Sequence, residues 1–369
     1  MLIEPKGKSR EPFSIGSVHR VLVSAIQITT LCVGLLFSVP LQAAPSLDNL
    51  LAMDLVVHFI DVGVGDAIFI ELPGSDDEVV IDGGDRNLGY NFLNYIGPYI
   101  DDIPIRLAIV THSDFDHWSG IERLLDEGHR VSEIWDPGYD RDCKFTGARA
   151  MQKKQRDQYL RFIHTLPRDG MRMRRPVPVD PVNPLLQLDQ VKFWVLHAES
   201  SPPKEDCAMM INDSSIVVRM QYKNVVFLFT GDANGKERAD PADVQPSHVE
   251  GDLLRLEAEH PGILKADVLK VPHHGSNTAS TREFVEAVSP RFAVISSSVA
   301  GKSHLPTERT IETYEDVRFG RSRHIEKLLR TDHGESGDWR SNYGSGHIVC
   351  GTNGESTDLV CDYLDKFEQ

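Results

Sequence analysis

The chain has few cysteines, and their spacing argues against the commonest kind of thiolate metal site. Among 369 residues there are five cysteines, of which Cys32 lies in an apolar N-terminal stretch. The other four form no C-x-x-C pair, the spacing that is typical of thiolate zinc sites. A cysteine-bound zinc is therefore not expected. An even number of cysteines favours disulfides in an oxidising compartment.

The positions of these four cysteines suggest two disulfides. Cys350 ends the apolar segment 347–350, and Cys361 lies in the apolar segment 359–362, on the far side of a turn-rich stretch. This pattern predicts a hairpin with a Cys350–Cys361 bridge. Cys143 and Cys207 would form the remaining pair. The chain also lacks internal repeats and low-complexity tracts, so a repeat architecture is not expected.

Basic residues are scarce relative to acidic ones. The chain has 39 Lys and Arg against 55 Asp and Glu, a formal net charge of −16, which becomes −18 without residues 1–43. A surface this acidic repels polyanions on average. This charge argues against a general nucleic-acid coat protein, although it leaves room for a local basic channel.

Long apolar runs are absent after residue 43. Before it, four basic residues within the first twenty precede an apolar run at 21–39, which Pro40 and the small residues 43–44 close. This order is typical of a signal peptide at 1–43 and predicts export to the periplasm or beyond. The alternative is an uncleaved anchor in the inner membrane that faces the periplasm, because the run is long enough to span a bilayer. With cleavage, no stable membrane partner is expected; the oligomeric state is left open.

Apolar strands repeatedly end in Asp or His, at Asp82, His112, Asp232 and His273. Side chains at strand ends are well placed to converge, because the sheet edge fixes them relative to one another. Helices are expected around 91–100, 120–127 and 282–288, which makes the chain an α/β protein. Strands are expected at 55–60, 67–72, 78–81, 105–110, 191–196, 215–221, 225–229, 267–271 and 292–296.

Four potential metal ligands stand within six residues directly after the apolar run 107–110. They are His112, Asp114, Asp116 and His117. Imidazole nitrogens and carboxylate oxygens are usual donors for zinc and manganese. Together with Asp82, Asp232 and His273 or His274, they suffice for two divalent ions, Zn or Mn, with Asp232 as the bridge. A pair of such ions lowers the pKa of a water held between them.

Five motifs together resemble the metallo-β-lactamase superfamily, and more narrowly the extramembrane domain of ComEC-type DNA-uptake proteins and their stand-alone relatives. The resemblance covers residues 55–306. It implies an αββα four-layer sandwich with a dinuclear site along the edge between the sheets. A hydrolase domain is then expected at 54–310, and a C-terminal extension with the disulfide hairpin at 311–369. The motifs are Asp61-Val62-Gly63-x-Gly65-Asp66, Ile81-Asp82-Gly83-Gly84, Thr111-His112-x-Asp114-x-Asp116-His117, Thr230-Gly231-Asp232 and His273-His274-Gly275-Ser276.

The resemblance implies a role for each site residue. His112 and Asp114 would hold one metal, and Asp116 and His117 the other. Asp232 would bridge, the pair His273-His274 would complete the second metal, and Asp82 would brace the ligand loop. Asp116 and His304 are the expected catalytic residues, with His304 touching substrate or donating a proton. Asn212 and Ser215, from a segment that resembles the family's Asn-x-x-Ser, would contact substrate.

Two other features are open to more than one interpretation. Asp61 and Asp66 flank glycines and are expected to shape a loop rather than to bind metal. Nine basic residues cluster between Arg149 and Arg175, opposed in sequence by Asp157 and Asp169. They form either a solvated helix face or a basic wall that attracts a phosphate-rich substrate.

These observations predict an exported, dinuclear-metal-dependent hydrolase that uses a metal-bound hydroxide. Its substrate would be a phosphodiester, either a small molecule or a nucleic acid. With a nucleic-acid substrate the protein would be a nuclease. One alternative is hydrolysis of a carboxylic ester, lactone or amide, since the same hydroxide attacks a carbonyl. Another is a binding protein that keeps the fold without turnover, although the presence of every expected ligand argues against it.

Overall fold

A computed structural model describes the chain between residues 49 and 364. The described ranges are 49–50, 52–74, 77–87, 90–100, 103–143, 150–166, 170–203, 206–241, 244–298, 304–315, 325–332 and 346–364. The chain divides into two units, Met1–Ala44 and Pro45–Gln369, and all described residues belong to the second. The leader expected at 1–43 lies outside the described residues. No helix within the described ranges has the length and apolar character that crossing a membrane requires.

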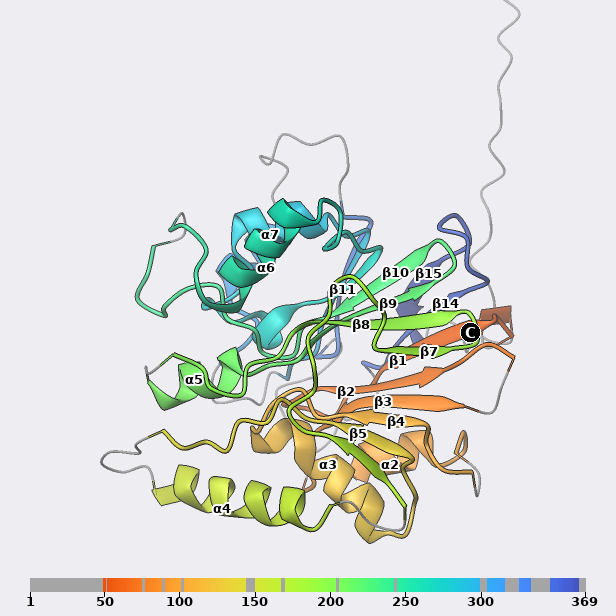
Figure 1. Cartoon of the computed structure of the whole chain (residues 1–369). Coiled ribbons are helices and arrows are strands. Elements are labelled where there is room, and N and C mark those ends of the chain that lie inside the picture. Colours follow the sequence, from red (N-terminus) through yellow and green to blue (C-terminus); the bar gives the residue numbers. More distant parts are fainter. Residues whose placement is uncertain are drawn as a thin grey trace, which may run out of the picture. The chain divides into compact units, whose positions relative to one another are not determined.

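The first sheet has eight strands in the order β15-β14-β1-β2-β3-β4-β5-β6. The pairs from β3 to β6 are parallel, so each needs a crossover, and α2, α3 and α4 supply them on the outer face of the sheet (Figure 1). The elements are β1 (Leu55–Phe59), β2 (Ala67–Glu71), β3 (Glu78–Gly83), α2 (Tyr90–Ile96), β4 (Leu107–Ile109), α3 (Phe115–Asp126), β5 (Glu133–Trp135), α4 (Ala150–His164), β6 (Arg172–Arg174), β14 (Ile348–Thr352) and β15 (Val360–Tyr363).

The second sheet has seven strands in the order β13-β12-β11-β10-β9-β8-β7. Helices α6 and α7 cover its outer face (Figure 1). The elements are β7 (Leu186–Leu188), β8 (Val191–His197), α5 (Cys207–Asp213), β9 (Val217–Tyr222), β10 (Val225–Phe229), α6 (His248–Glu259), β11 (Val268–Lys270), the 3₁₀ turn η1 (Pro272–Gly275), α7 (Arg282–Val288), β12 (Phe292–Ile295), α8 (Glu308–Glu315) and β13 (Lys327–Arg330). The αββα sandwich and the α/β class expected from the sequence are thus confirmed.

Apolar side chains form three layers, one between the sheets and one under each set of helices. Phe59, Phe193 and Phe227 belong to the layer between the sheets, where all three are fully buried. Trp118 belongs to the layer between the first sheet and its helices, and Phe284 belongs to the layer between the second sheet and its helices. Burial on both faces explains why β1 and β3 read as continuous apolar runs rather than alternating ones. Each fully buried side chain of this size contributes about 1.5–3 kcal/mol.

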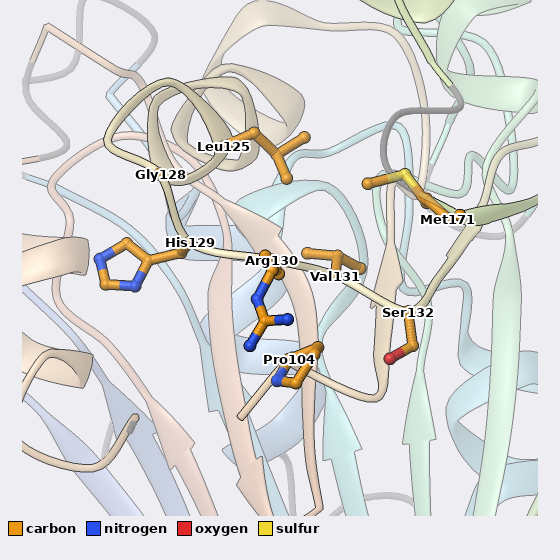
Figure 2. A pocket seen from close by; sticks show the side chains of 9 residues that line it. Pro104, Leu125, Gly128, His129, Arg130, Val131, Ser132 and Met171 are labelled. Atoms are coloured by element: carbon orange, nitrogen blue, oxygen red, sulfur yellow. The ribbon is translucent and has the colours of Figure 1, made fainter. Parts of the chain in front are cut away.

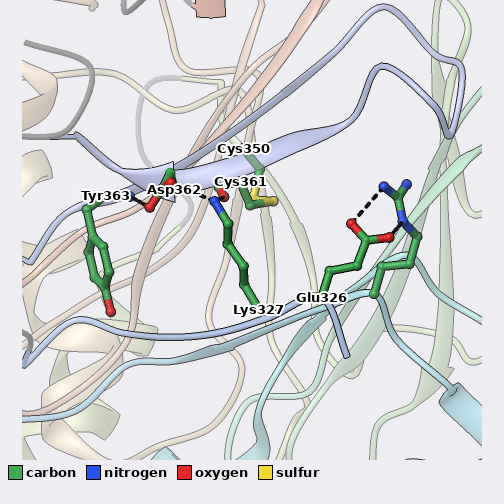
Figure 3. Close-up of a disulfide and its surroundings, with 7 residues drawn as sticks. Glu326, Lys327, Cys350, Cys361, Asp362 and Tyr363 are labelled. Atoms are coloured by element: carbon green, nitrogen blue, oxygen red, sulfur yellow. Dashed lines mark hydrogen bonds and ion pairs between the residues drawn. A yellow bond between two sulfur atoms is a disulfide. The ribbon is translucent and has the colours of Figure 1, made fainter. Parts of the chain in front are cut away.

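The C-terminal segment supplies strands to both sheets. β13 pairs in parallel with β12, whereas β14 and β15 form an antiparallel hairpin beside β1. Cys350 and Cys361 face each other across this hairpin and form a disulfide, and Lys327 Nζ lies 2.6 Å from Asp362 Oδ2 (Figure 3). Cys143 and Cys207 form the other disulfide. Both pairs expected from the sequence are therefore confirmed.

Candidate metal centre

The strand ends that carry Asp or His meet at one edge of the sandwich. Asp82 lies at the end of β3, His112 just after β4, Asp232 just after β10, and His273 and His274 just after β11. Parallel strands place their carboxyl ends at the same edge of a sheet, and β3 is parallel to β4 as β10 is to β11. Ligand atoms lie within 4.8 Å of one another in four groups: His112, His117 and Asp232; Asp116, His117 and His274; Asp66, Asp232 and His274; and Asp66, Asp82 and His117.

The carboxylate of Asp232 lies at the centre of this cluster. Its Oδ2 is 3.8 Å from His112 Nε2 and 3.4 Å from His274 Nε2, and its Oδ1 is 3.5 Å from His117 Nε2. The two nitrogens His117 Nε2 and His274 Nε2 are 3.3 Å apart. This is the position that the sequence assigned to the bridging ligand.

Unpartnered atoms in the cluster fit divalent metal ions. His112 Nε2, Asp232 Oδ1 and Asp66 Oδ1 are buried and have no hydrogen-bond partner within the described part of the chain. Buried polar atoms nearly always have a partner, so several unpartnered imidazole and carboxylate atoms that face one another call for a cation. Nitrogen and oxygen donors of this kind suit zinc or manganese.

Asp82 braces the ligand loop from behind. Its Oδ1 accepts a hydrogen bond from Thr111 N at 2.9 Å, and its Oδ2 accepts one from Thr111 Oγ1 at 2.6 Å. Asp82 Oδ2 also lies 2.8 Å from His117 Nδ1. A carboxylate on one ring nitrogen fixes the orientation of a histidine and directs the other nitrogen to the metal. The contact of His274 Nδ1 with Ser296 O, 3.0 Å, does the same for His274.

Glycines allow the ligand loop to pack this closely. Asp114 is the N-cap of α3, so Asp116 and His117 fall in the first turn of that helix. A Cβ on Gly65 would lie 2.0 Å from Asp116 O, and a Cβ on Gly120 would lie 1.9 Å from the carbonyl oxygen of Gly83 in β3. Side chains at these two glycines would push the first turn of α3 away from the sheet and from the cluster.

Asp114 is placed at the rim of the cluster. Its side chain is 32% exposed, and its Oδ2 lies 3.8 Å from His112 Nε2. Its other oxygen, Oδ1, lies 3.2 Å from Nη2 of Arg141, a residue that is 1% exposed. Asp114 belongs to none of the four ligand groups, but it lies within reach of a metal held by His112, and a buried cation fixes its orientation.

Asp66 belongs to the cluster, contrary to the loop-shaping role expected from the sequence. It is 1% exposed, forms an ion pair with Lys270, and its Oδ1 lies 3.4 Å from His274 Nδ1. Lys270 is equally buried in β11, donates a hydrogen bond from Nζ to Gly231 O at 3.0 Å, and lies 3.9 Å from Asp232 Oδ1. Lys270 has one signal in the sequence, namely that it is a charged residue inside an apolar strand.

The two neighbouring histidines differ in their surroundings. His274 contributes to two of the ligand groups, whereas His273 contributes to none. His273 Nδ1 lies 2.9 Å from Thr278 Oγ1, and its Nε2 is 3.2 Å from Asn212 Nδ2 and 3.9 Å from Asp232 Oδ2. The geometry therefore favours His274 as the ligand and places His273 beside it.

Three residues expected to touch substrate lie in different places. Ser215 is fully buried, and its Oγ accepts a hydrogen bond from Asp232 N at 3.1 Å, so it positions Asp232 rather than reaching a substrate. Asn212 is 4% exposed and faces His273. His304 is exposed and is not part of any ligand group within the described residues. A catalytic role for His304 stays a prediction.

Opposing charges govern the protonation of the cluster without metal. Burial raises the pKa of Asp232, but His274 and His117 outweigh it and hold that pKa well below its ordinary value. Burial lowers the pKa of His274, yet Asp232 and Asp66 raise it to about 10, and Asp232 and Asp82 raise the pKa of His117 in the same way. Burial, helped by His117, lowers the pKa of His112.

Metal uptake is expected to release protons. At pH 7 His274, with a pKa of about 10, and His117 are protonated in the metal-free protein, and a ligating imidazole must be neutral. Titrating metal into the protein at pH 7 should release at least about one proton per chain. Calorimetry in two buffers with different ionisation enthalpies measures this number. An observed enthalpy that does not depend on the buffer would contradict the placement of these histidines.

Part of the basic segment neutralises carboxylates of the protein itself. Arg174 Nε lies 2.5 Å from Glu133 Oε1, and Arg175 Nε lies 2.9 Å from Asp136 Oδ1. Lys153 and Lys154 are exposed near the start of α4. Because α4 connects the parallel strands β5 and β6, it begins at the edge where the cluster lies. Arg174 and Arg175 therefore pair with carboxylates of the protein itself, whereas Lys153 and Lys154 stay exposed at this edge.

A pocket lies at the opposite edge of the first sheet, where β4, β5 and β6 begin (Figure 2). Its lining contains one histidine, His129, one arginine, Arg130, and no carboxylate. None of its residues belongs to the ligand groups, so it is separate from the metal centre.

Comparisons with known proteins point to the same superfamily as the sequence motifs. Residues 60–191 match the family model of the Metallo-beta-lactamase superfamily. The ComE operon protein 3 of Bacillus subtilis (strain 168) is 25% identical over 292 residues, 75% of this chain and 32% of that protein. Competence protein ComA of Neisseria gonorrhoeae is 35% identical over 146 residues, 40% of this chain and 17% of that protein. The crystal structure of the metallo-beta-lactamase fold protein YhfI from Bacillus subtilis aligns with a TM-score of 0.43 and 11% identity, over 76% of this chain and 97% of that one.

The resemblance found in the motifs is thus confirmed. Residues 60–191 match the metallo-β-lactamase superfamily, whose members are generally metal-dependent hydrolases. The chain is ComEC-like, and the matched regions span 32% of the length of the ComE operon protein 3 and 17% of the length of competence protein ComA.

Proposed function

We propose that this protein is an exported hydrolase of phosphodiester bonds that depends on two divalent metal ions. The observation that carries the proposal is the convergence of His112, His117, His274 and Asp232 in one cluster. Several imidazole and carboxylate atoms of this cluster are buried and lack a hydrogen-bond partner among the described residues. Zinc or manganese is the proposed metal, since imidazole and carboxylate donors suit both. Divalent ions bound here would make water nucleophilic at neutral pH and would stabilise negative charge on the substrate.

The protein's own residues supply position and charge. Asp232 holds the two halves of the cluster together, because its oxygens face His112 on one side and His117 and His274 on the other. Asp82 keeps His117 in one orientation. Lys270 adds a fixed positive charge beneath the carboxylates. Ligands held this firmly need little reorganisation during the reaction, which is the main source of electrostatic stabilisation in enzymes.

A phosphate ester fits the charge around the site better than a neutral ester does. Lys153 and Lys154 are exposed near the start of α4, at the same edge as the cluster. Exposed cations at this edge attract an anionic substrate even though the whole chain is acidic. The resemblance of the motifs to ComEC-type DNA-uptake proteins favours a substrate class that includes nucleic acid as well as small phosphodiesters.

Export is supported by the disulfides. Both pairs, Cys143–Cys207 and Cys350–Cys361, join cysteines of the folded domain. Disulfides form and persist in oxidising compartments such as the bacterial periplasm, and they are rare in the cytosol. We therefore place the hydrolase domain in the periplasm or outside the cell, delivered by the N-terminal leader.

Asp116→Ala is expected to abolish hydrolysis and leave the fold largely intact. The side chain of Asp116 is partly buried in the first turn of α3 and belongs to a ligand group with His117 and His274. Its loss should lower turnover of bis-p-nitrophenyl phosphate by at least about 10²-fold, the effect of one preorganised electrostatic contact. Metal content, turnover of this substrate and turnover of a simple aryl ester are measured on the same preparations.

The matched control is Asp126→Ala, which removes a 45% exposed carboxylate from the other end of the same helix. Wild-type rates in Asp116→Ala would refute the assignment. Turnover of the aryl ester alone would replace the phosphodiester proposal with carboxylic ester hydrolysis. A protein that holds no metal and hydrolyses neither substrate would be a binding protein that retains the fold.

A further inference from the structure

Arg141 is a buried cation whose guanidinium contacts the ligand loop. It is 1% exposed, its Nη1 donates a hydrogen bond to Ser113 O at 2.6 Å, and its Nη2 lies 3.2 Å from Asp114 Oδ1. Its Nε is buried and has no hydrogen-bond partner among the described residues. A side chain this buried does not reach a substrate, so its effect is exerted through Ser113 and Asp114.

The backbone of Arg141 is held in an unfavourable conformation. Its φ is 52°, in the left-handed region that residues with a Cβ rarely adopt. Such a conformation persists only when the surrounding structure enforces it. At one end of the segment 136–143, Asp136 accepts a hydrogen bond from Gly138 N at 2.8 Å and pairs with Arg175. At the other end, Cys143 is covalently joined to Cys207.

The Cys143–Cys207 disulfide connects two walls of the site. Cys207 is the first residue of α5, and Asn212, near the end of that helix, contacts His273. Tyr139 packs on the same helix, where its hydroxyl lies 3.9 Å from Met210 Sδ. The disulfide therefore fixes the segment that carries Arg141 to the helix that lies against the histidine pair.

We propose that Arg141 is a positioning residue for the metal ligand Asp114, and that the Cys143–Cys207 disulfide is the covalent strut that keeps Arg141 in place. Arginine suits this role because its planar fork contacts a carbonyl and a carboxylate at once and never loses its charge. The inference rests on the proposed function and on Asp114 as a further ligand of the metal beside His112. It makes metal retention depend on a bond that forms in an oxidising compartment.

The experiment measures metal affinity by chelator competition, with Zn²⁺ and with Mn²⁺, on the full chain and its variants. Arg141→Gln should weaken binding by about 10–100-fold, as loss of an outer partner of a metal ligand does. The metal affinity of Arg141→Lys should fall between those of the wild type and Arg141→Gln, because one ammonium keeps the charge but cannot make both contacts. The double variant Cys143→Ser/Cys207→Ser should also weaken binding, by less than Arg141→Gln does, because it loosens the segment that holds Arg141 but keeps the guanidinium.

The second disulfide provides a matched control. Cys350→Ser/Cys361→Ser opens the bridge of the β14–β15 hairpin and should leave metal affinity unchanged. Thermal unfolding of every variant, recorded with chelator, shows whether it is folded. A combined variant that carries Arg141→Gln and both Cys143→Ser and Cys207→Ser should bind metal no more weakly than Arg141→Gln alone, because both changes act through one contact.

Wild-type metal affinity in a folded Arg141→Gln would overturn the inference. Equal affinities for the two disulfide variants, or additive losses in the combined variant, would overturn the role of the strut. A wild-type protein that binds neither metal would instead refute the proposed function, so the two failures are distinguishable.

Discussion

Asp232→Asn is expected to remove both metal retention and hydrolysis. Asp232 is the residue shared by both halves of the cluster, and its carboxylate oxygens lie 3.4–3.8 Å from three histidine nitrogens. Loss of an outer partner of a ligand already costs about 10–100-fold in metal affinity, so loss of this ligand should cost more. Hydrolysis should fall by about 10³-fold or more, because even one preorganised contact contributes about 10²–10³.

Metal content and steady-state rates of the purified variant test this expectation, with circular dichroism as the check on folding. Asp252→Asn is the control, since Asp252 is a 48% exposed carboxylate on α6, outside the ligand groups. If Asp232→Asn retained wild-type metal content, the central place given to this carboxylate would be wrong.

Lys270→Met is expected to destabilise the metal-free protein strongly. Methionine keeps most of the volume of lysine, but it leaves the buried carboxylate of Asp66 without its ion-pair partner and removes the nearest lysine from Asp232. Breaking a buried ion pair from one side costs about 3–5 kcal/mol, because an uncompensated charge remains in the interior. Unfolding by urea in the presence of chelator should show a loss of that size.

The double variant Asp66→Asn/Lys270→Met separates charge from packing. Replacing both partners of a buried pair by uncharged groups is often neutral, so the double variant should recover much of the lost free energy of unfolding. Saturating metal should also reduce the loss in Lys270→Met, because a bound cation would compensate the buried carboxylate charge that the lysine no longer pairs. A double variant whose losses simply add would show that the two side chains act independently.

The sequence was sufficient for the frame of the molecule and for most of the cluster. The strand predicted at 225–229 and the helix predicted at 282–288 coincide with β10 and α7, and the motifs placed Asp232 at the centre of the site. These features are local: an apolar run marks a buried strand, and a ligand that follows it inherits the position of the strand end. The two disulfides followed from the number of cysteines and the hairpin pattern.

Elements without a local apolar signal could not be predicted in this way. β6 is Arg-Met-Arg and is strand only because it pairs with β5. Helix α6 lies inside the stretch 235–262, which reads as an acidic, proline-containing insert, although Val249 and Leu253 bury one face of it. Tertiary contacts override weak propensity in both cases.

Three residues of the site could not be predicted from the sequence, and the reason is the same for each. Asp66, Lys270 and Arg141 act through partners far away in sequence, so no spacing rule connects them. Lys270 left a trace as a charge inside an apolar strand, because a buried lysine requires a partner. Arg141 left no comparable trace, since its role depends on where the segment 136–143 folds back onto the ligand loop.

The most direct test of the account is anomalous scattering from crystals grown with Zn²⁺ or Mn²⁺, recorded at the metal edge. Two peaks are expected, one beside His112 and one beside His117 and His274, with the carboxylate of Asp232 between them. A map without peaks in this region, or with peaks only at surface histidines, would contradict the assignment of a metal centre to the edge between the sheets.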